Sequence, residues 1–179
     1  MNVTSIAFIA DYVKTGMPLI KKRITVDGTV VKEPKNVEVL IGTQLEDVFE
    51  FCGGFKEDPY KVLMGGPMMG IAQFSLQTSV VKNTNALIAL DKKEGDLPDE
   101  GVCIRCGRCV DACPMNLLPL NINLNVLNEN YEELDKYHVM DCVECGSCSF
   151  VCPAKRHLVQ SIRLAKAIVR KQAQKQKTG

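Results

Sequence analysis

The sequence predicts an α+β protein made of two domains in series. Three observations predict this. Strand-like and helix-like segments alternate over residues 19–90, a polar and turn-rich segment follows at residues 91–101, and eight of the nine cysteines lie beyond it in two similar motifs. A chain of 179 residues with 46% hydrophobic content is long enough to bury a core in each domain.

Residues 1–18 form a predicted leading helix with apolar side chains on one side, which Gly16 ends. Because so little chain precedes the first predicted strand, we expect this segment to be the truncated end of a longer protein. Residues 91–101 are charged and rich in Gly and Pro, and we expect them to be a linker.

Residues 19–90 are predicted to form short strands around one helix. Asp27-Gly28 stands between two β-branched runs, which is typical of a hairpin turn. Thr43-Gln-Leu-Glu46 is typical of a capping box that begins a helix, and Gly53-Gly54 ends that helix. The predicted strands cover residues 24–26, 29–31, 37–41, 61–64, 80–81 and 86–90. This order of strands and helix fits a β-grasp fold.

The glycine-rich segment Met64-Gly-Gly-Pro-Met-Met-Gly70 follows a predicted strand. Such a segment could cradle a phosphate or let a cofactor approach the backbone. It lacks the Lys-Ser/Thr of a Walker loop and the spacing of G-x-G-x-x-G. We favour a tight turn, with Met68 and Met69 as packing residues rather than an electron relay.

Eight cysteines lie in two copies of the spacing C-x2-C-x2-C-x3-C-P, at 103–114 and 142–153. Bacterial two-cluster ferredoxins hold a pair of [4Fe-4S] clusters with this spacing, and the fourth cysteine of each copy ligates the other cluster. We therefore predict two [4Fe-4S] clusters and an electron-transfer role, with no catalytic side chain. One predicted ligand set is Cys103, Cys106, Cys109 and Cys152. The other is Cys142, Cys145, Cys148 and Cys113.

Several residues beside these ligands have two explanations. Gly107 and Gly146 stand between the second and third cysteines, where a missing Cβ allows a sharp bend toward cluster sulfur, although ordinary turns also use glycine. Four basic residues near the ligands would favour a more negative reduced cluster, and solubility explains them equally well. They are Arg105, Arg108, Lys155 and Arg156.

Other uses of the cysteines fit the motifs less well. Structural zinc sites usually pair two C-x2-C knuckles, and here a third and a fourth cysteine follow in register. A disulfide framework needs an oxidising compartment, and no secretion signal is evident. Cys52 is predicted to be a buried core thiol. We expect His138 and His157 to be structural or exposed, since the cysteines complete both clusters.

The second domain is predicted to cover residues 102–170. Leu117, Leu120, Leu124 and Leu127 recur at helical intervals between the two motifs, a second short helix is predicted at residues 131–137, and Leu158, Ile162, Ala165 and Val169 mark one face of a closing helix. These helices favour an α-helical ferredoxin-like fold. Residues 171–179 are basic and lack apolar anchors, so we expect a disordered tail, although a contact with anionic lipid or an acidic partner is an alternative.

The sequence contains no apolar run long enough to span a membrane. Its formal net charge is +1, and we expect no nucleic-acid partner. Any attachment to a membrane is therefore expected to come through partner proteins.

The chain resembles the C-terminal part of the C subunit of the Rnf electron transport complex. The residues that carry the resemblance are 31–37, 41–43, 64–70, 103–119 and 141–166. The resemblance implies a soluble-ligand-binding β-grasp (SLBB) domain followed by a double [4Fe-4S] domain. It also implies that FMN and NADH bind only in a preceding domain that has no counterpart here, so this fragment is not expected to turn over alone.

By the same resemblance, the intact complex is an ion-translocating ferredoxin:NAD oxidoreductase, and this module would relay single electrons at the cytoplasmic face of the cell membrane. Its partners would be the membrane subunits and ferredoxin or another redox protein. An electron donor for a soluble reductase, such as a cobalamin reductase, is an alternative. A zinc-binding interaction module is another.

Overall fold

The computed structural model describes the backbone of residues 3–178 and the side chains of residues 3–175. The chain divides into two compact units, Met1–Asp96 and Leu97–Gly179. This division falls inside the predicted linker. The predicted terminal segments, residues 1–18 and 171–179, include Met1, Asn2 and Gly179, which lie outside the described residues.

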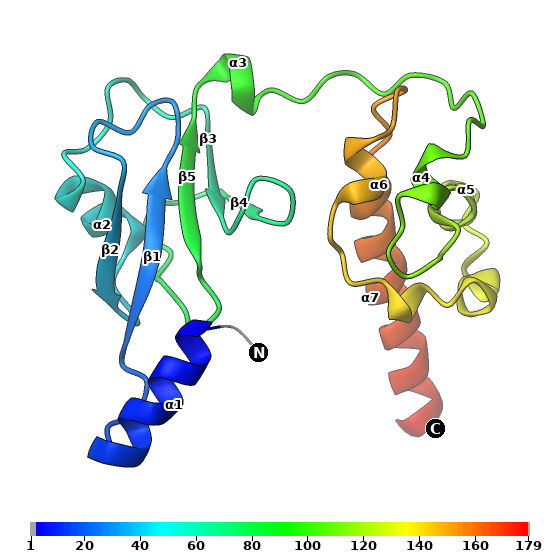
Figure 1. Ribbon diagram of the computed structural model, residues 1–179. Helices are drawn as coiled ribbons and strands as arrows, with labels where there is room; N and C mark the ends of the chain where they lie inside the picture. The colour runs from blue at the N-terminus through cyan, green and yellow to red at the C-terminus, as the bar shows by residue number, and fades with distance from the viewer. Residues whose placement is uncertain (1–2, 179) are drawn as a thin grey trace. The chain divides into compact units, whose positions relative to one another are not determined.

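The first unit contains a five-stranded mixed sheet in the order β2-β1-β5-β3-β4 (Figure 1). Only β1 and β5 pair in parallel, and the other neighbouring strands are antiparallel. The strands are β1 (Lys21–Asp27), β2 (Lys35–Leu40), β3 (Lys61–Met64), β4 (Ile71–Gln73) and β5 (Ala86–Leu90). This arrangement confirms the predicted α+β class.

The core of the first unit lies between the sheet and helix α2 (Leu45–Phe51). Inward side chains alternate along β1, where Ile24 and Val26 are buried, as expected for a sheet with one covered face. Leu45, Val48 and Phe49 of α2 pack against them in the same cluster. This apolar burial is the main stabilising contribution in the unit.

The predicted hairpin at Asp27-Gly28 is wrong. β1 pairs instead with β2, which begins after seven intervening residues, in the register Val26 opposite Lys35. Val30 and Val31 are consecutive and both fully buried, so residues 29–31 do not alternate as a strand at a sheet surface would. Gly28 has φ of 128°, and an added Cβ would lie 2.0 Å from the carbonyl oxygen of Ala89. The glycine therefore permits close passage over β5 rather than a two-residue turn.

Helix α2 is where the sequence predicts a helix, but the capping box is absent. Its N-cap is Gln44, which makes no side-chain capping bond. The N–H groups of Leu45 and Glu46 donate instead to the carbonyl oxygens of Thr78 and Leu76. A tertiary backbone contact thus satisfies the first turn. The strand predicted at residues 80–81 is wrong, and the residue before them, Ser79, makes an isolated bridge to Gln44.

The first unit has two further helices, α1 and α3. Helix α1 (Val3–Thr15) ends before Gly16 as predicted, and none of its residues is buried. Helix α3 (Lys92–Gly95) lies within the predicted linker, where the Asp91 carboxylate accepts from the Glu94 N–H at 2.9 Å. The Tyr60 hydroxyl donates to Asp96 at 3.1 Å. The start of the linker is therefore attached to the first unit.

The second unit is helical and has no strand among its described residues. Its elements are α4 (Arg108–Asp111), α5 (Pro119–Leu127), the 3₁₀ helices η1 (Tyr131–Tyr137) and η2 (Val139–Asp141), α6 (Ser147–Phe150) and α7 (Leu158–Thr178). A small apolar core joins α5, η1 and α7, with Ile122, Leu134 and Ile162 almost fully buried.

The prediction of the buried face is confirmed for α7 and wrong in part for α5. The predicted face of α7 is buried, at Leu158, Ile162, Ala165 and Val169. Helix α5 exists, but it buries Ile122 and Val126 and leaves the predicted Leu124 and Leu127 exposed. Its sequence carries apolar residues on two faces, so periodicity alone does not select one.

Helix α7 continues through the segment expected to be a disordered tail, as far as Thr178. Residues 171–175 are exposed, so packing does not hold this part of the helix. Lys, Gln and Ala all have favourable helix propensities, and this propensity extends the helix beyond its last buried residue, Val169.

Candidate iron-sulfur site

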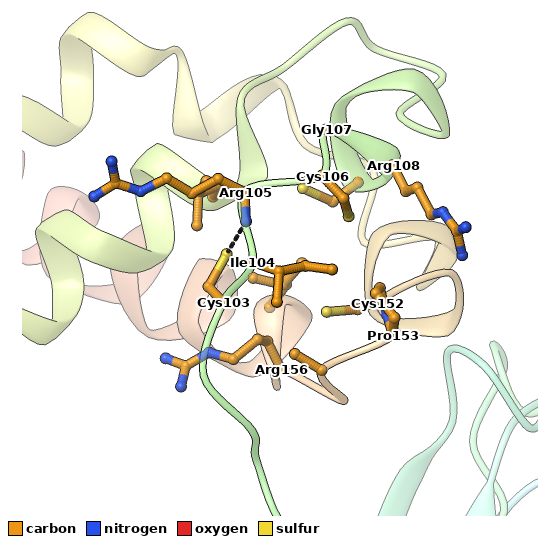
Figure 2. Close-up of a pocket in the computed structure, with 13 residues that line it drawn as sticks. Cys103, Ile104, Arg105, Cys106, Gly107, Arg108, Cys152, Pro153 and Arg156 are labelled. Atoms are coloured by element: carbon orange, nitrogen blue, oxygen red, sulfur yellow. Dashed lines mark hydrogen bonds between the residues drawn. The ribbon is translucent and has the colours of Figure 1, made fainter.

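Two pockets in the second unit are each lined by four cysteines. Cys103, Cys106, Cys109 and Cys152 line the first pocket. Cys113, Cys142, Cys145 and Cys148 line the second pocket. Each set takes three cysteines from one motif and the fourth from the other motif, in the grouping that the sequence predicts. Figure 2 shows the sulfur atoms of Cys103, Cys106 and Cys152 on different sides of the first pocket.

The two pockets are structural copies. One constant shift along the chain takes Cys103 to Cys142, and the same shift backwards takes Cys152 to Cys113. Nearly every lining residue of the first pocket has its equivalent in the second. The equivalent pairs are Cys103 and Cys142, Ile104 and Val143, Arg105 and Glu144, Cys106 and Cys145, Gly107 and Gly146, Cys109 and Cys148, Leu120 and Val159, Cys152 and Cys113, Pro153 and Pro114, Ala154 and Met115, Arg156 and Leu117, and Leu158 and Pro119.

The backbone repeats as well. Gly107 and Gly146 are left-handed N-cap residues of α4 and α6, with φ of 79° and 86°. Arg105 and Glu144, two positions before these glycines, are also left-handed, with φ of 53° and 55°. Non-glycine residues rarely adopt this conformation. Each cysteine loop is therefore bent twice within three residues, and the three cysteines of each loop line one pocket.

These bends also direct backbone N–H groups at sulfur. The Arg105 N–H donates to Cys103 Sγ at 3.4 Å, and the Glu144 N–H donates to Cys142 Sγ at 3.3 Å. The Leu117 N–H makes a similar contact with Cys113 Sγ at 3.4 Å. Donors of this kind stabilise negative charge on a metal-bound thiolate.

Burial raises the pKa of several of the thiols. It raises the pKa of Cys148 to about 11, and the neighbouring Cys142, Cys145 and Cys113 add to the shift. Burial also raises the pKa of Cys109. Because a thiol must lose its proton to bind a metal, loading these sites releases protons and is favoured by higher pH.

Arg156 is held at the first pocket by two contacts of its guanidinium group. Nη1 lies 3.4 Å from a carboxylate oxygen of Glu100, and Nη2 donates to Asn123 Oδ1 at 3.3 Å. The remaining donor, Nε, is buried and has no hydrogen-bond partner. A buried donor without a partner is costly. An acceptor within the pocket, such as cluster sulfur, would satisfy it.

Glu144 occupies a different electrostatic setting in the second pocket. It accepts from Lys166 Nζ at 2.7 Å and from Arg163 Nε at 2.9 Å. Lys166 is itself buried and also donates to the carbonyl oxygen of Cys142 at 2.9 Å. The hydrogen bonds from Lys166 and Arg163 hold the pKa of Glu144 below its usual range. The carboxylate is thus kept ionised and paired.

The residues present fit [4Fe-4S] clusters. Each pocket offers four thiols, backbone donors to sulfur and an apolar wall that includes Leu120 or Val159. A cubane needs four thiolates, and three closely spaced cysteines with one distant cysteine supply them. The unpartnered Nε of Arg156 adds a donor that the protein alone leaves unused.

The remaining predicted residues lie outside the ligand sets. Cys52 is fully buried in the core of the first unit, as predicted. His138 is exposed and left-handed, with φ of 49°. The His157 N–H donates to Glu100 at 2.5 Å. The sequence analysis missed Glu144, Lys166 and Asn123, because only the folded chain brings the closing helix beside the second cysteine motif.

Two family models match the chain. The SLBB domain model matches residues 23–72, within the first unit. The 4Fe-4S dicluster domain model matches residues 102–156, which contain both cysteine motifs. The chain therefore carries a soluble-ligand-binding type domain and a domain for two [4Fe-4S] clusters. No described helix is both long enough and apolar enough to cross a membrane.

Curated relatives resemble the chain over nearly its whole length. The C subunit of the proton-translocating ferredoxin:NAD(+) oxidoreductase complex of Clostridium ljungdahlii is 45% identical over 98% of the chain. The Na(+)-translocating counterpart of Acetobacterium woodii is 43% identical over 93% of it. The C subunit of the ion-translocating oxidoreductase complex of Methanosarcina acetivorans is 42% identical over 92% of it.

The chain spans 39%, 38% and 37% of the lengths of these three relatives. Both matched domains and the two cysteine motifs fall within the shared segment. The chain belongs to the family formed by the C subunits of ion-translocating ferredoxin:NAD oxidoreductase complexes, known as Rnf complexes.

Proposed function

We propose that the chain is a one-electron relay whose two [4Fe-4S] clusters are held by crossed ligand sets. The observation that carries the proposal is the composition of the two pockets, each lined by three cysteines of one motif and the fourth of the other. When bound, such clusters accept and release single electrons with little change in geometry. Among the described residues that line these pockets, no other side chain is suited to redox chemistry.

The protein's part in the relay is to hold and enclose the clusters. The glycine bends direct the thiols inward, and the backbone N–H groups of Arg105 and Glu144 contact sulfur. Helices α4 and α6 follow the bends directly, so each cysteine loop is fixed by its own helix. Crossing the ligands also ties the two motifs together, which keeps the clusters adjacent.

Pairs of cysteine substitutions test the crossed ligand sets. Cys103→Ser with Cys152→Ser removes two ligands from one cluster, so iron should fall from about eight to about four per chain. Cys142→Ser with Cys152→Ser removes one ligand from each cluster, and both clusters should be lost or severely depleted. Anoxic reconstitution followed by iron and sulfide analysis measures this, with Cys52→Ala as the control that keeps both clusters.

An uncrossed arrangement predicts the opposite pattern for the two double variants. Cys142 and Cys152 would then share a cluster, and that variant would retain about four irons. A colourless protein that binds zinc in place of iron and sulfide would contradict the relay itself.

We further infer that the relay works inside a membrane complex that couples electron transfer between ferredoxin and NAD to ion movement. The relatives' names support this, since they are subunits of translocating complexes. The chain would be a peripheral component on the cytoplasmic face, associated with the membrane subunits and supplied by ferredoxin or another redox protein. Co-purification of the tagged chain with membrane subunits, and its protease sensitivity in inside-out but not right-side-out vesicles, test this assignment.

A further inference from the structure

We propose that the cluster in the first pocket has the higher reduction potential of the two, and that Arg105, Arg108 and Arg156 set this difference. The inference rests on the proposed function, because it requires both clusters to be present. It concerns which of two structurally equivalent sites holds the first electron, and it follows from the three positions at which the pockets differ in charge.

The three arginines are confined to the first pocket. Arg105, Arg108 and Arg156 all line it. Their equivalents in the other repeat are Glu144, Ser147 and Leu117. Adding one electron to a cluster adds one negative charge, and nearby positive charge favours that reduced state. All three replacements therefore change the potential in the same direction.

Arg156 should have the largest effect. Its side chain is 17% exposed, and the low local dielectric strengthens its interaction with charge in the pocket. Its buried Nε has no partner within the protein, so it can donate to cluster sulfur, and a hydrogen bond to sulfur also raises the potential. Leu117, the equivalent residue at the second pocket, has no side-chain donor.

Arg105 and Arg108 contribute from the surface. Both side chains are exposed, and Figure 2 shows their head groups extended on opposite sides of the first pocket. Solvent and salt screen exposed charges, so each of these residues should contribute less than Arg156.

Less positive charge surrounds the second pocket than the first. Glu100 offsets one of the three arginines at the first pocket, and Glu144 offsets one of its two basic partners, Lys166 and Arg163, at the second. Two positive charges therefore remain at the first pocket and one at the second. The second pocket is also more enclosed, because Cys148 is buried and Cys145 is half-buried, whereas Cys106 is exposed. Low solvent access disfavours the more negative reduced state. Charge and enclosure thus favour the same order of potentials.

Potentiometric titration of the reconstituted chain, followed by EPR, tests the order. Dithionite supplies electrons through mediator dyes, and each cluster takes up one electron. The unsubstituted chain should show two resolved reduction steps. Arg156→Leu should weaken reduction in the higher-potential step by about tenfold in its equilibrium constant, or about 59 mV for one electron. Arg105→Glu and Arg108→Ser should shift the same step by smaller amounts.

Matched variants separate an electrostatic effect from damage to the fold. Arg156→Lys keeps the charge and should recover part of the shift. Glu144→Gln should raise the lower-potential step and leave the higher one unchanged. Lys171→Glu makes the same charge change as Arg105→Glu on the exposed end of α7, about 13 Å along the helix from Ile162, and should move neither step appreciably.

Three results would overturn the inference. They are a single unresolved step in the unsubstituted chain, a shift of the lower-potential step by the arginine substitutions, and unchanged potentials in the arginine variants. All three require intact clusters, which iron analysis and the EPR signal intensity establish. Absence of the clusters would instead contradict the proposed function.

Discussion

The two units of the chain are stabilised in different ways. The first unit has a continuous apolar core between a five-stranded sheet and α2. The second unit has a smaller core, no described strand, and two α-helices of only four residues beside its cysteines. All six non-glycine residues with positive φ among the described residues also lie in the second unit: Arg105, Asn116, Glu129, His138, Glu144 and Lys155.

Because of this difference, we expect the second unit to depend on metal–thiolate bonds for its stability. Each left-handed non-glycine residue costs about 1–2 kcal/mol, and four-residue helices are not stable alone. The positive-φ residues Asn116 and Lys155 occupy equivalent places after the fourth cysteine of each motif. Four of the six strained residues, Arg105, Asn116, Glu144 and Lys155, therefore lie within or directly after the cysteine motifs, where metal–thiolate bonds would offset the strain.

The largest expected effect comes from removing iron. Chelation under anoxic conditions should unfold most of the second unit and leave the first unit folded, because all eight predicted ligands lie in the second unit. Hydrogen exchange measured by mass spectrometry should show lost protection in peptides of residues 103–169 and unchanged protection in β1 and β5. If the second unit keeps its protection without iron, its apolar core alone keeps it folded, and the two units do not differ in how they are stabilised.

A substitution in the core of the first unit should destabilise that unit and leave the clusters of the second unit in place. Phe49 is 1% exposed and packs against Phe55 with ring centroids 4.8 Å apart. Phe49→Ala should lower the free energy of unfolding of the first unit by about 3–5 kcal/mol. Urea denaturation monitored by circular dichroism measures the loss, and cluster absorbance should be unchanged in the same sample at low urea. Simultaneous loss of absorbance would show that the units are not independently stabilised.

Relief of backbone strain should give a smaller, stabilising effect. Lys155 has φ of 52°, which glycine adopts without penalty. Lys155→Gly should stabilise the second unit by about 0.5–1 kcal/mol, after the greater flexibility of glycine in the unfolded chain is subtracted.

The matched control is Lys32→Gly, an exposed loop position of the first unit without positive φ. This change should destabilise its unit by about 0.5–1 kcal/mol. Thermal melting of both variants compares the signs. Destabilisation by both substitutions would mean that the left-handed loops are not strained.

The smallest expected effect is at the surface of the sheet. Hydrogen bonds from Lys21 and Arg23 hold the pKa of Glu38 below its usual range. A carboxyl with a lowered folded-state pKa contributes stability above its unfolded pKa and loses it as the pH falls through its folded pKa. Glu38→Gln should therefore lower the melting temperature of the first unit slightly at pH 7 and less at pH 3. An equal difference at both pH values would contradict the ion-pair explanation.

Much of the first fold was predictable from local sequence signals. Residues 61–64 and 86–90 form the expected strands, and α2 ends at the expected glycines. The pairing of β1 was not predictable from Asp27-Gly28, because that glycine is required by a contact with Ala89, sixty-one residues further along the chain. Local turn signals do not report such distant constraints.

The cysteine grouping at the site was predictable because the ligand spacing is itself the signal. The charges around the site were only partly predictable. Arg105, Arg108 and Arg156 were noted beside the cysteines, but the structure was needed to show that Arg156, which follows the second motif, lines the first pocket with the other two. Lys166 was not singled out in the sequence because it is one of many basic residues of a long helix, and its burial and its ion pair with Glu144 are seen only in the fold.

Helix α7 contacts both pockets within its first five residues, because Leu158 lines the first pocket and Val159 and Ile162 line the second. One short segment of hydrogen-bonded backbone therefore forms part of the wall of both redox centres. A helix does not stretch when other parts of the chain move, so the tunnelling gap between the centres, and with it the rate of the internal electron transfer, should stay constant while partners bind and leave.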